Sequence, residues 1–197
     1  IIFKISRTDY YYDYQSYGSQ PIKGDVTKTK KYDFLNDKTT TTRLIYDSIG
    51  NVIETKDGKN YSTSYTYEST NNFISSSTNA LNQNVSFNYD LKTGNLLSKT
   101  DSNNITIYYE YDPLGRLTKE ILPYSNPENP SKLIEYYIDN NPPHKVITSY
   151  LTDYSEGERI YNYEFYDGFL KTIQTKQKAE NNNVIVNNVF YNKLGTK

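Results

Sequence analysis

Apolar and polar residues alternate with a period of two along much of the chain. Val85, Phe87 and Tyr89 fall on one face of an extended segment, and Ser86 and Asn88 fall on the other. The same alternation recurs in residues 61–67 and 105–111. A period of two is that of a β-strand, and the frequent Thr, Val, Ile and Tyr residues favour strands as well. No segment has a convincing helical period, so the pattern predicts an all-β chain.

A Tyr-Asp motif follows these strands at a steady spacing. It occurs in residues 46–52, 89–96 and 111–117, with a weaker copy at Tyr67-Glu68. The tyrosines at positions 46, 67, 89 and 111 are separated by 21, 22 and 22 residues. A constant separation indicates a structural repeat. Two degenerate copies begin at Tyr166 and Tyr191.

The residues of the motif predict a tight turn. The aspartate can accept hydrogen bonds from backbone N–H groups just ahead of it. The glycine that follows, such as Gly50 or Gly115, can adopt a positive φ at little cost and so close the turn. A second β-run and a second turn cluster complete each unit of about 22 residues. Joined end to end, such units form an antiparallel meander of hairpins.

The rest of the chain divides into less regular segments. Residues 1–43 are expected to be a degenerate β segment, 44–122 the repeats, 123–143 proline-rich loops with a short strand, and 144–197 further degenerate strands. No linker is long enough to separate two domains, so we expect one continuous structural unit. The expected C-terminal strands are residues 145–152, 159–166, 170–178 and 184–191, with turns at 153–157, 167–168 and 180–183. The chain has no Met and ends within a repeat, which suggests a fragment of a longer polypeptide.

Composition excludes several classes of protein. The chain has no Cys, which rules out disulfides, thiolate zinc sites and thiol catalysis. Its formal net charge is −1, whereas nucleic-acid binders usually carry a basic surplus. No segment reaches the roughly 20 apolar residues of a membrane helix, so we expect no membrane segment. Its 23 tyrosines argue against disorder, which is poor in aromatic residues.

The motif at Tyr111-Asp112-Pro113-Leu114-Gly115-Arg116-Leu117 closely resembles the YD repeat of RHS proteins, and residues 44–122 carry the resemblance. Residues 163–176 look like strands of the B and C subunits of insecticidal Tc toxin complexes, although Leu170-Lys171 replaces Gly-Arg. The resemblance implies a segment of a β-sheet that spirals into a hollow shell around a cytotoxic C-terminal polypeptide. The aspartyl-protease core that closes RHS shells has no counterpart that we can place here.

Two features of the repeat allow an alternative interpretation. The Asp and Gly residues could form calcium sites, but each copy supplies about one carboxylate, so we favour turn chemistry. The tyrosines on the periodic faces could bind carbohydrate, but cross-strand packing accounts for them as well. These tyrosines are Tyr61, Tyr65, Tyr67, Tyr89, Tyr109 and Tyr111.

Isolated polar residues offer weak candidates for a site. His144 follows two prolines and is predicted to be a solvated loop residue. Asp153 could form a glycosidase carboxyl pair with Glu156 or Glu158, but these residues lie in a short turn that is expected to be solvated. The basic run at 28–31 is flanked by acidic residues and is expected to be an exposed strand face.

We therefore predict a structural segment of a secreted or cell-surface bacterial protein of the RHS or Tc toxin type. Its expected partners are the remainder of its own shell, the enclosed toxic polypeptide and other toxin-complex subunits; no nucleic acid is expected. We predict no enzyme activity, and no catalytic, cofactor or metal residues. The first alternative is an extracellular carbohydrate- or cell-surface-binding module with tyrosine-lined sites. The second is a polysaccharide lyase, in which Arg43, Arg116 or Arg159 would meet a tyrosine hydroxyl.

Overall fold

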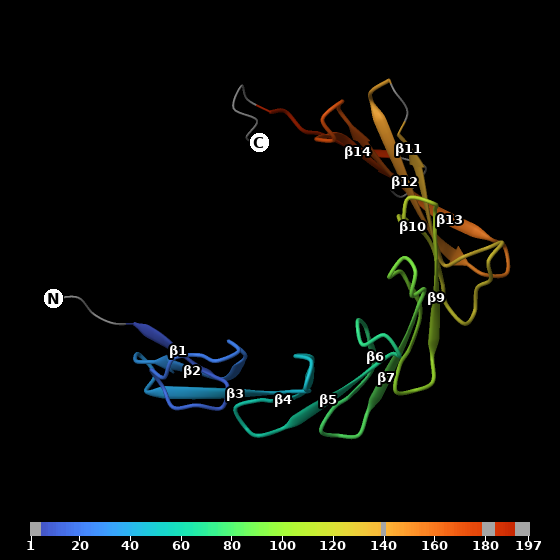
Figure 1. Cartoon of the computed structure of the whole chain (residues 1–197). Helices are drawn as coiled ribbons and strands as arrows, with labels where there is room; N and C mark the ends of the chain where they lie inside the picture. Colours follow the sequence, from blue (N-terminus) through green and yellow to red (C-terminus); the bar gives the residue numbers. More distant parts are fainter. Residues whose placement is uncertain (1–4, 139–140, 179–183, 192–197) are drawn as a thin grey trace. The chain divides into compact units, whose positions relative to one another are not determined.

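The computed structural model describes residues 5–138, 141–178 and 184–191. These residues contain fifteen β-strands and no helix, so none of the described chain is a helix that could cross a membrane. Every pair of strands whose register is resolved is antiparallel, and the strands follow chain order (Figure 1). The predicted all-β antiparallel meander is confirmed.

Two compact units make up the chain. The first comprises residues Ile1–Asn88 with Thr100–Asn104, and the second Tyr89–Lys99 with Ile105–Lys197. The prediction of one continuous unit, with segment boundaries at residues 43, 122 and 143, remains a prediction.

The first unit is a meander of long and then short strands. Its strands are β1 (Ser6–Tyr12), β2 (Val26–Asp33), β3 (Lys38–Tyr46), β4 (Val52–Lys56), β5 (Ser62–Tyr67), β6 (Ile74–Thr78) and β7 (Asn84–Tyr89). A 13-residue loop joins β1 to β2, and Tyr17 of this loop packs on Tyr11, with ring centroids 5.5 Å apart. The ladder shifts register between Ile45 and Tyr46 and again between Thr66 and Tyr67, just before the motif turns.

The second unit repeats the same connection. Its strands are β8 (Leu96–Thr100), β9 (Thr106–Tyr111), β10 (Leu117–Ile121), β11 (Lys132–Tyr137), β12 (His144–Asp153), β13 (Glu158–Tyr166), β14 (Thr172–Lys178) and β15 (Val184–Asn188). The strands expected at 145–152 and 159–166 are present as β12 and β13, whereas those expected at 170–178 and 184–191 are shorter, as β14 and β15. Residues 122–131 form a loop between β10 and β11. The turn expected at 180–183 and the one after Tyr191 lie outside the described residues.

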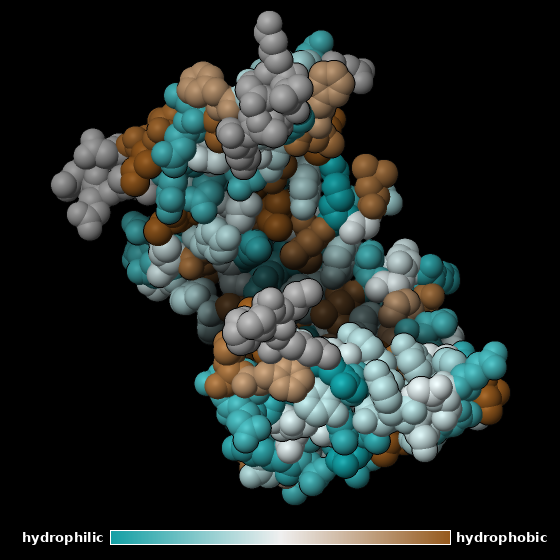
Figure 2. Space-filling model, turned by 90° about the vertical axis from the view of Figure 1, so that its left-hand side faces the viewer, coloured by the Kyte–Doolittle hydropathy of each residue, from teal (hydrophilic) through white to brown (hydrophobic). Residues whose placement is uncertain are grey.

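Few side chains are fully buried. Among the described residues, only Ile121, Pro130 and Leu151 are buried apolar side chains. Most strand residues are half-buried, and apolar side chains are interspersed with polar ones on the face drawn in Figure 2. Within each unit, strands pack against their sequence neighbours, so each unit is a single layer of sheet.

Candidate functional site

The aspartate of the motif closes each turn with its side chain. Asp112 Oδ1 accepts hydrogen bonds from the N–H groups of Leu114 and Arg116, both at 2.9 Å. The same pair of bonds, to the second and fourth residues ahead, is made by Asp47, Asp57, Asn79 and Asp167. Burial alone would raise the pKa of Asp112, but the hydrogen bonds from Arg116 and Leu114 outweigh it and lower that pKa. The predicted turn chemistry is confirmed.

The positive φ of each turn lies where the motif predicts it. Gly50, Gly94 and Gly115 have φ values of 100°, 78° and 76°. Turns without a glycine at this position use asparagine, which tolerates the left-handed region better than most residues. These residues are Asn60, Asn71, Asn82 and Asn104.

The degenerate turn at residues 167–171 breaks this rule. Leu170 holds the position of the missing glycine, with a φ of 58°. Gly168 lies two residues earlier and does not adopt a positive φ. A leucine in this conformation is strained, since its Cβ crowds the backbone.

The tyrosine of the motif joins one repeat to the one before it. Tyr67 donates its hydroxyl hydrogen bond to the carbonyl of Val52, and Tyr111 donates to Leu96, each at 3.0 Å. Val52 and Leu96 are the first residues of β4 and β8. Tyr46, Tyr136 and Tyr191 make the same bond to Val26, Leu117 and Thr172.

The acceptor carbonyls share one place in the sheet. Val52 lies two residues beyond the last β4–β5 pair, Glu54 with Ser64. Val26, Leu117 and Thr172 likewise lie two residues beyond the last pair of their ladders. The phenol therefore supplies a donor where the two strands have stopped pairing, which a phenylalanine could not do. We call these bonds the tyrosine ties.

Sequence reasoning missed the tyrosine ties and one of their members. It assigned the tyrosines to packing, because period-two alternation reports the face of a residue and not the partner of its hydroxyl. Tyr136 precedes no Tyr-Asp motif and was not recognised. The signal that could have found it is its position 25 residues after Tyr111, the same separation as that between Tyr166 and Tyr191.

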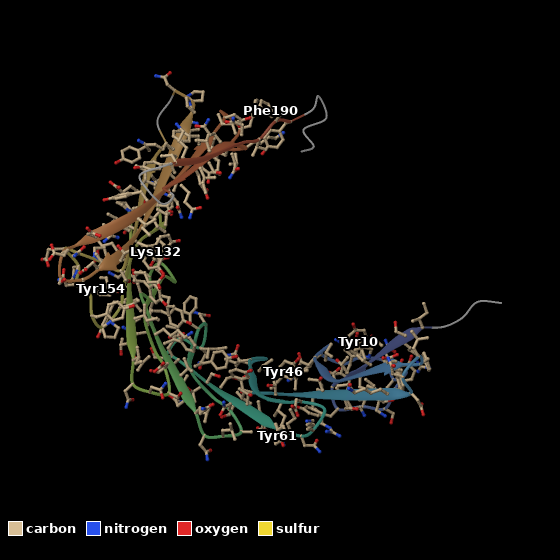
Figure 3. The ribbon with its side chains drawn as sticks, turned by 180° about the vertical axis from the view of Figure 1, so that it is seen from behind. Tyr10, Tyr46, Tyr61, Lys132, Tyr154 and Phe190 are labelled. Atoms are coloured by element: carbon tan, nitrogen blue, oxygen red, sulfur yellow. The ribbon has the colours of Figure 1, made fainter. Side chains whose placement is uncertain are left out.

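The periodic tyrosines do not form an exposed platform. Of the six expected on the strand faces, only Tyr61, which is labelled in Figure 3, is exposed, at 60%. The other five are half-buried. Partial burial raises the pKa of Tyr67, Tyr89, Tyr109 and Tyr111. This geometry fits sheet packing better than flat stacking on sugars.

The prediction for His144 is wrong. It is the first residue of β12, is 8% exposed, and pairs with Tyr166 of β13. No described residue forms a hydrogen bond with its Nδ1 atom. Two prolines favour a loop, but they end immediately before β12, and His144 is the first, buried residue of that strand.

The side chain of Asp153 closes the acidic turn after β12 with hydrogen bonds to the backbone. Asp153 Oδ1 accepts hydrogen bonds from the N–H groups of Ser155 and Glu156, at 2.8 and 3.0 Å. Glu156 and Glu158 are exposed. No three His, Cys, Asp or Glu side chains in the described ranges gather as metal ligands would.

The three arginines singled out for a lyase have structural partners. Arg43 donates to Asn60 Oδ1 at 2.8 Å, and Arg116 forms an ion pair with Asp112 at 2.6 Å. Arg159 donates to the Ser149 hydroxyl and carbonyl, to Asn129 Oδ1 and to the Pro130 carbonyl, at 2.7–3.2 Å. It thereby fastens the proline-rich loop to β12, and burial lowers its pKa.

Part of the sequence is similar to a known protein family. The family model of the RHS Repeat matches residues 89–126, which hold two of the Tyr-Asp motifs. A search of curated proteins found no match.

Solved structures share the fold at low identity. One is the crystal structure of TcdB2-TccC3-Cdc42, with 16% identity and a TM-score of 0.60, covering 81% of this chain and 9% of that chain. A second is TcdB2-TccC3 without its hypervariable C-terminal region, with 13% identity and a TM-score of 0.51, covering 89% and 12%. A third, at 13% identity and a TM-score of 0.49, is a Photorhabdus luminescens Tc holotoxin pore, covering 84% and 11%. This chain thus spans about a tenth of the length of the chains it matches.

Proposed function

We propose that this chain, which carries RHS repeats and resembles Tc toxin proteins in fold, is a wall segment of a bacterial toxin shell. In this proposal the sheet separates a cytotoxic polypeptide from solvent and proteases until delivery. Its partners are the rest of the shell, the enclosed polypeptide and other toxin-complex subunits. Its location is secreted or at the cell surface, and its role is structural and not enzymatic.

The single-layer sheet supports this proposal most strongly. Only three apolar side chains, those of Ile121, Pro130 and Leu151, are buried in the described part of a 197-residue chain. A globular domain of this size would bury far more, because folding depends on removing apolar surface from water. A sheet whose units bury their faces against neighbouring repeats needs no second layer of its own.

Both outer strands also fit a wall that continues. Among the described residues, β1 and β15 each have one paired neighbour. Val184, Ile185 and Val186 of β15 are all exposed, at 45–57%. An open apolar edge is a liability unless further strands cover it.

Protease protection tests containment in the full-length polypeptide that includes this chain. We expect its C-terminal segment to resist a protease in the wild type and to become cleavable in the Gly115→Val variant, which strains a wall turn. Gly168→Ala is the matched control, because Gly168 has no positive φ and an added Cβ meets no atom closer than 3.9 Å. A C-terminal segment that is cleaved equally fast in wild type and variant contradicts the proposal.

A further inference from the structure

Three cationic side chains stand in one row across neighbouring strands of the first unit. Lys28 of β2 pairs directly with Arg43 of β3, and Arg43 pairs with Lys56 of β4. Tyr11 of β1 extends the row, opposite Lys28. Directly opposed residues of antiparallel strands share a face, so all four side chains lie on the same side of the sheet.

This arrangement works against the stability of the sheet. Like charges directly opposite each other on adjacent strands are destabilising. Neighbouring strands lie about 4.8 Å apart, and each of three consecutive strands carries a cation at this position. The head groups relieve the repulsion by turning to different partners: Lys28 Nζ lies 3.7 Å from the Tyr11 ring centroid, and Lys56 lies 3.4 Å from a Glu54 oxygen.

Two of the three cations have no acid to neutralise them. In the part of the chain that the structure describes, no carboxylate lies within ion-pair distance of Lys28 or Arg43. Asp9, on the same face, is already bound by Arg7. Lys30 lies next to Lys28 on this face and adds a further positive charge.

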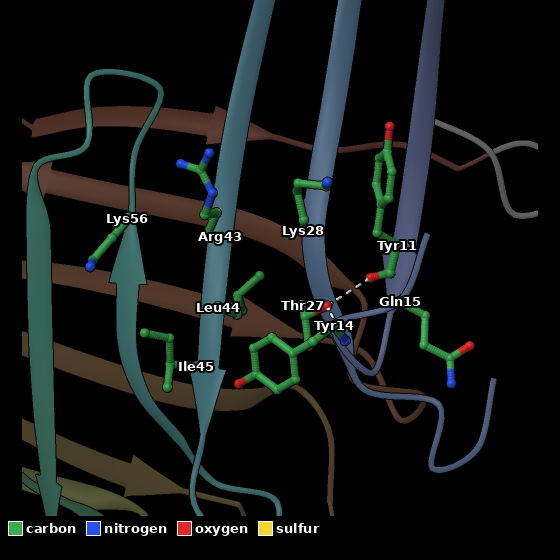
Figure 4. A pocket seen from close by; sticks show the side chains of 9 residues that line it. All are labelled: Tyr11, Tyr14, Gln15, Thr27, Lys28, Arg43, Leu44, Ile45 and Lys56. Atoms are coloured by element: carbon green, nitrogen blue, oxygen red, sulfur yellow. Dashed lines mark hydrogen bonds between the residues drawn. The ribbon is translucent and has the colours of Figure 1, made fainter. Parts of the chain in front are cut away.

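The row borders a hollow that is open to solvent. The hollow has a volume of ≈270 Å³, and Lys28, Arg43, Lys56 and the rings of Tyr11 and Tyr14 line it (Figure 4). Tyr14 is 67% exposed, and its hydroxyl accepts a hydrogen bond from the Tyr46 N–H at 3.3 Å, which holds the ring at the border of the hollow. An exposed aromatic face beside Lys28 and Arg43, which have no carboxylate partner among the described residues, combines a surface for a sugar ring with partners for its acidic substituents.

We propose that this hollow binds an acidic glycan, with a sulfate or carboxylate group between Lys28 and Arg43 and a sugar ring on Tyr14. The bound anion offsets the repulsion that the row creates. Nucleic acid is disfavoured, because the whole chain carries a net charge of −1 and gives no long-range attraction to a phosphate backbone. This site is independent of the proposed wall function.

Binding measurements on the full 197-residue chain test the proposal. Fluorescence anisotropy at low ionic strength is measured with a labelled sulfated hexasaccharide, a carboxylate-only hexasaccharide and a neutral hexasaccharide. We expect both acidic sugars, or one of them, to bind and the neutral one not to bind. We expect Lys28→Gln and Arg43→Gln each to weaken binding by about three- to fivefold, the range for one exposed ionic contact.

Lys31→Gln is the matched control, since Lys31 lies on the same strand and on the opposite face. It should leave the affinity unchanged. The melting temperature separates binding from folding: at low salt, Arg43→Gln should melt close to the wild type, because the removal of a repulsive charge offsets the loss of the exposed hydrogen bond to Asn60. The proposal is overturned if neither acidic sugar binds, or if the neutral sugar binds equally well. It is also overturned if Lys31→Gln loses as much affinity as the other two variants, or if a 12-base-pair DNA duplex binds more tightly than the acidic sugars.

Discussion

Leu170 and Gly115 occupy the same place in two copies of one turn, with φ values of 58° and 76°. Glycine adopts this conformation freely, whereas an L-residue with a Cβ loses about 1–2 kcal/mol there. An added Cβ on Gly115 would meet only the Asn95 side chain, at 3.8 and 3.9 Å. The requirement for glycine at this position is therefore one of backbone conformation and not of space.

Opposite substitutions at the two positions should have opposite effects. We expect Gly115→Val to lower the free energy of unfolding by about 1–3 kcal/mol, and Leu170→Gly to raise it by about 1 kcal/mol. Urea denaturation measures both. Gly168→Ala, outside the positive-φ position, should stay within about 0.5 kcal/mol of the wild type. An unchanged midpoint in both variants would show that the turns do not impose this conformation.

Glu68 replaces the aspartate in the weaker copy of the motif and still closes its turn. It accepts hydrogen bonds from the Thr70 hydroxyl and from the N–H groups of Thr70, Asn72 and Phe73. The Thr70 hydroxyl is the largest influence, and together these bonds lower the pKa of Glu68 to about 2. Because the folded state holds the ionised form more strongly than the unfolded state does, protons oppose folding at this residue.

Acid titration should reveal this coupling. The contribution of Glu68 is complete above its ordinary pKa of 4.5 and is lost as the pH falls toward about 2. We expect Glu68→Gln to be less stable than the wild type at pH 7 and to approach it at pH 2. Melting temperatures across this range measure the difference. A difference that is constant with pH contradicts the assignment.

At the scale of the strand pair, the tyrosine ties explain why the repeat uses tyrosine. In four of the five ties the acceptor carbonyl, that of Val26, Val52, Leu117 or Thr172, lies two residues beyond the last pair of its ladder. The strands separate there because the chain enters the Asp turn. The aspartate and the tyrosine of one motif thus act in different places: the aspartate within its own turn, and the tyrosine on the previous repeat.

Removal of one hydroxyl should measure a tie. We expect Tyr111→Phe to lower the free energy of unfolding by about 0.5–1.5 kcal/mol, the net value of a hydrogen bond. Tyr108→Phe is the matched control on the same strand, because Tyr108 is 55% exposed. Equal stability of the two variants in urea denaturation would show that the Leu96 carbonyl does not need the phenol.

Arg159 should control the order of the proline-rich loop. Its four hydrogen bonds reach Ser149 on β12 and the loop residues Asn129 and Pro130. We expect Arg159→Lys to lower the free energy of unfolding by about 1.5–3 kcal/mol, because lysine keeps the charge but lacks the planar fork of donors. Limited proteolysis should then cut first within residues 122–131. Wild-type stability and an uncut loop would contradict this role.

Most of the strands and turns could be predicted from the sequence because they depend on local order. Alternation placed the strands, and the Asp-x-x-Gly spacing placed Gly50 and Gly115 at positive φ. The features that could not be predicted depend on residues far apart in the chain. Arg159 reaches Asn129 across 30 positions, and His144 is a buried strand residue paired with the distant Tyr166, neither of which a local pattern reveals. The hydrogen-bond partners of the tyrosine hydroxyls could not be predicted either, since the periodicity of the sequence carries no information about them.

At the scale of the whole molecule, each unit behaves as a one-dimensional array. Strands contact their neighbours in sequence, and half-buried tyrosines replace a fully buried core. The stability of such an array is approximately the sum of its repeats and their interfaces. It follows that an outer repeat gains stability from whatever covers its edge, which is the physical reason for expecting further strands beside β1 and β15.

An electron cryo-microscopy map of the full-length polypeptide that contains this chain tests the central claim most directly. We predict that residues 5–138 and 141–178 form a single layer of sheet, continued by other strands of the same polypeptide, with the tyrosine hydroxyls on the carbonyls of the preceding repeat. We also predict protein density enclosed on one side of that layer. A map in which these strands pack face to face against a second sheet as a solid domain would contradict the account.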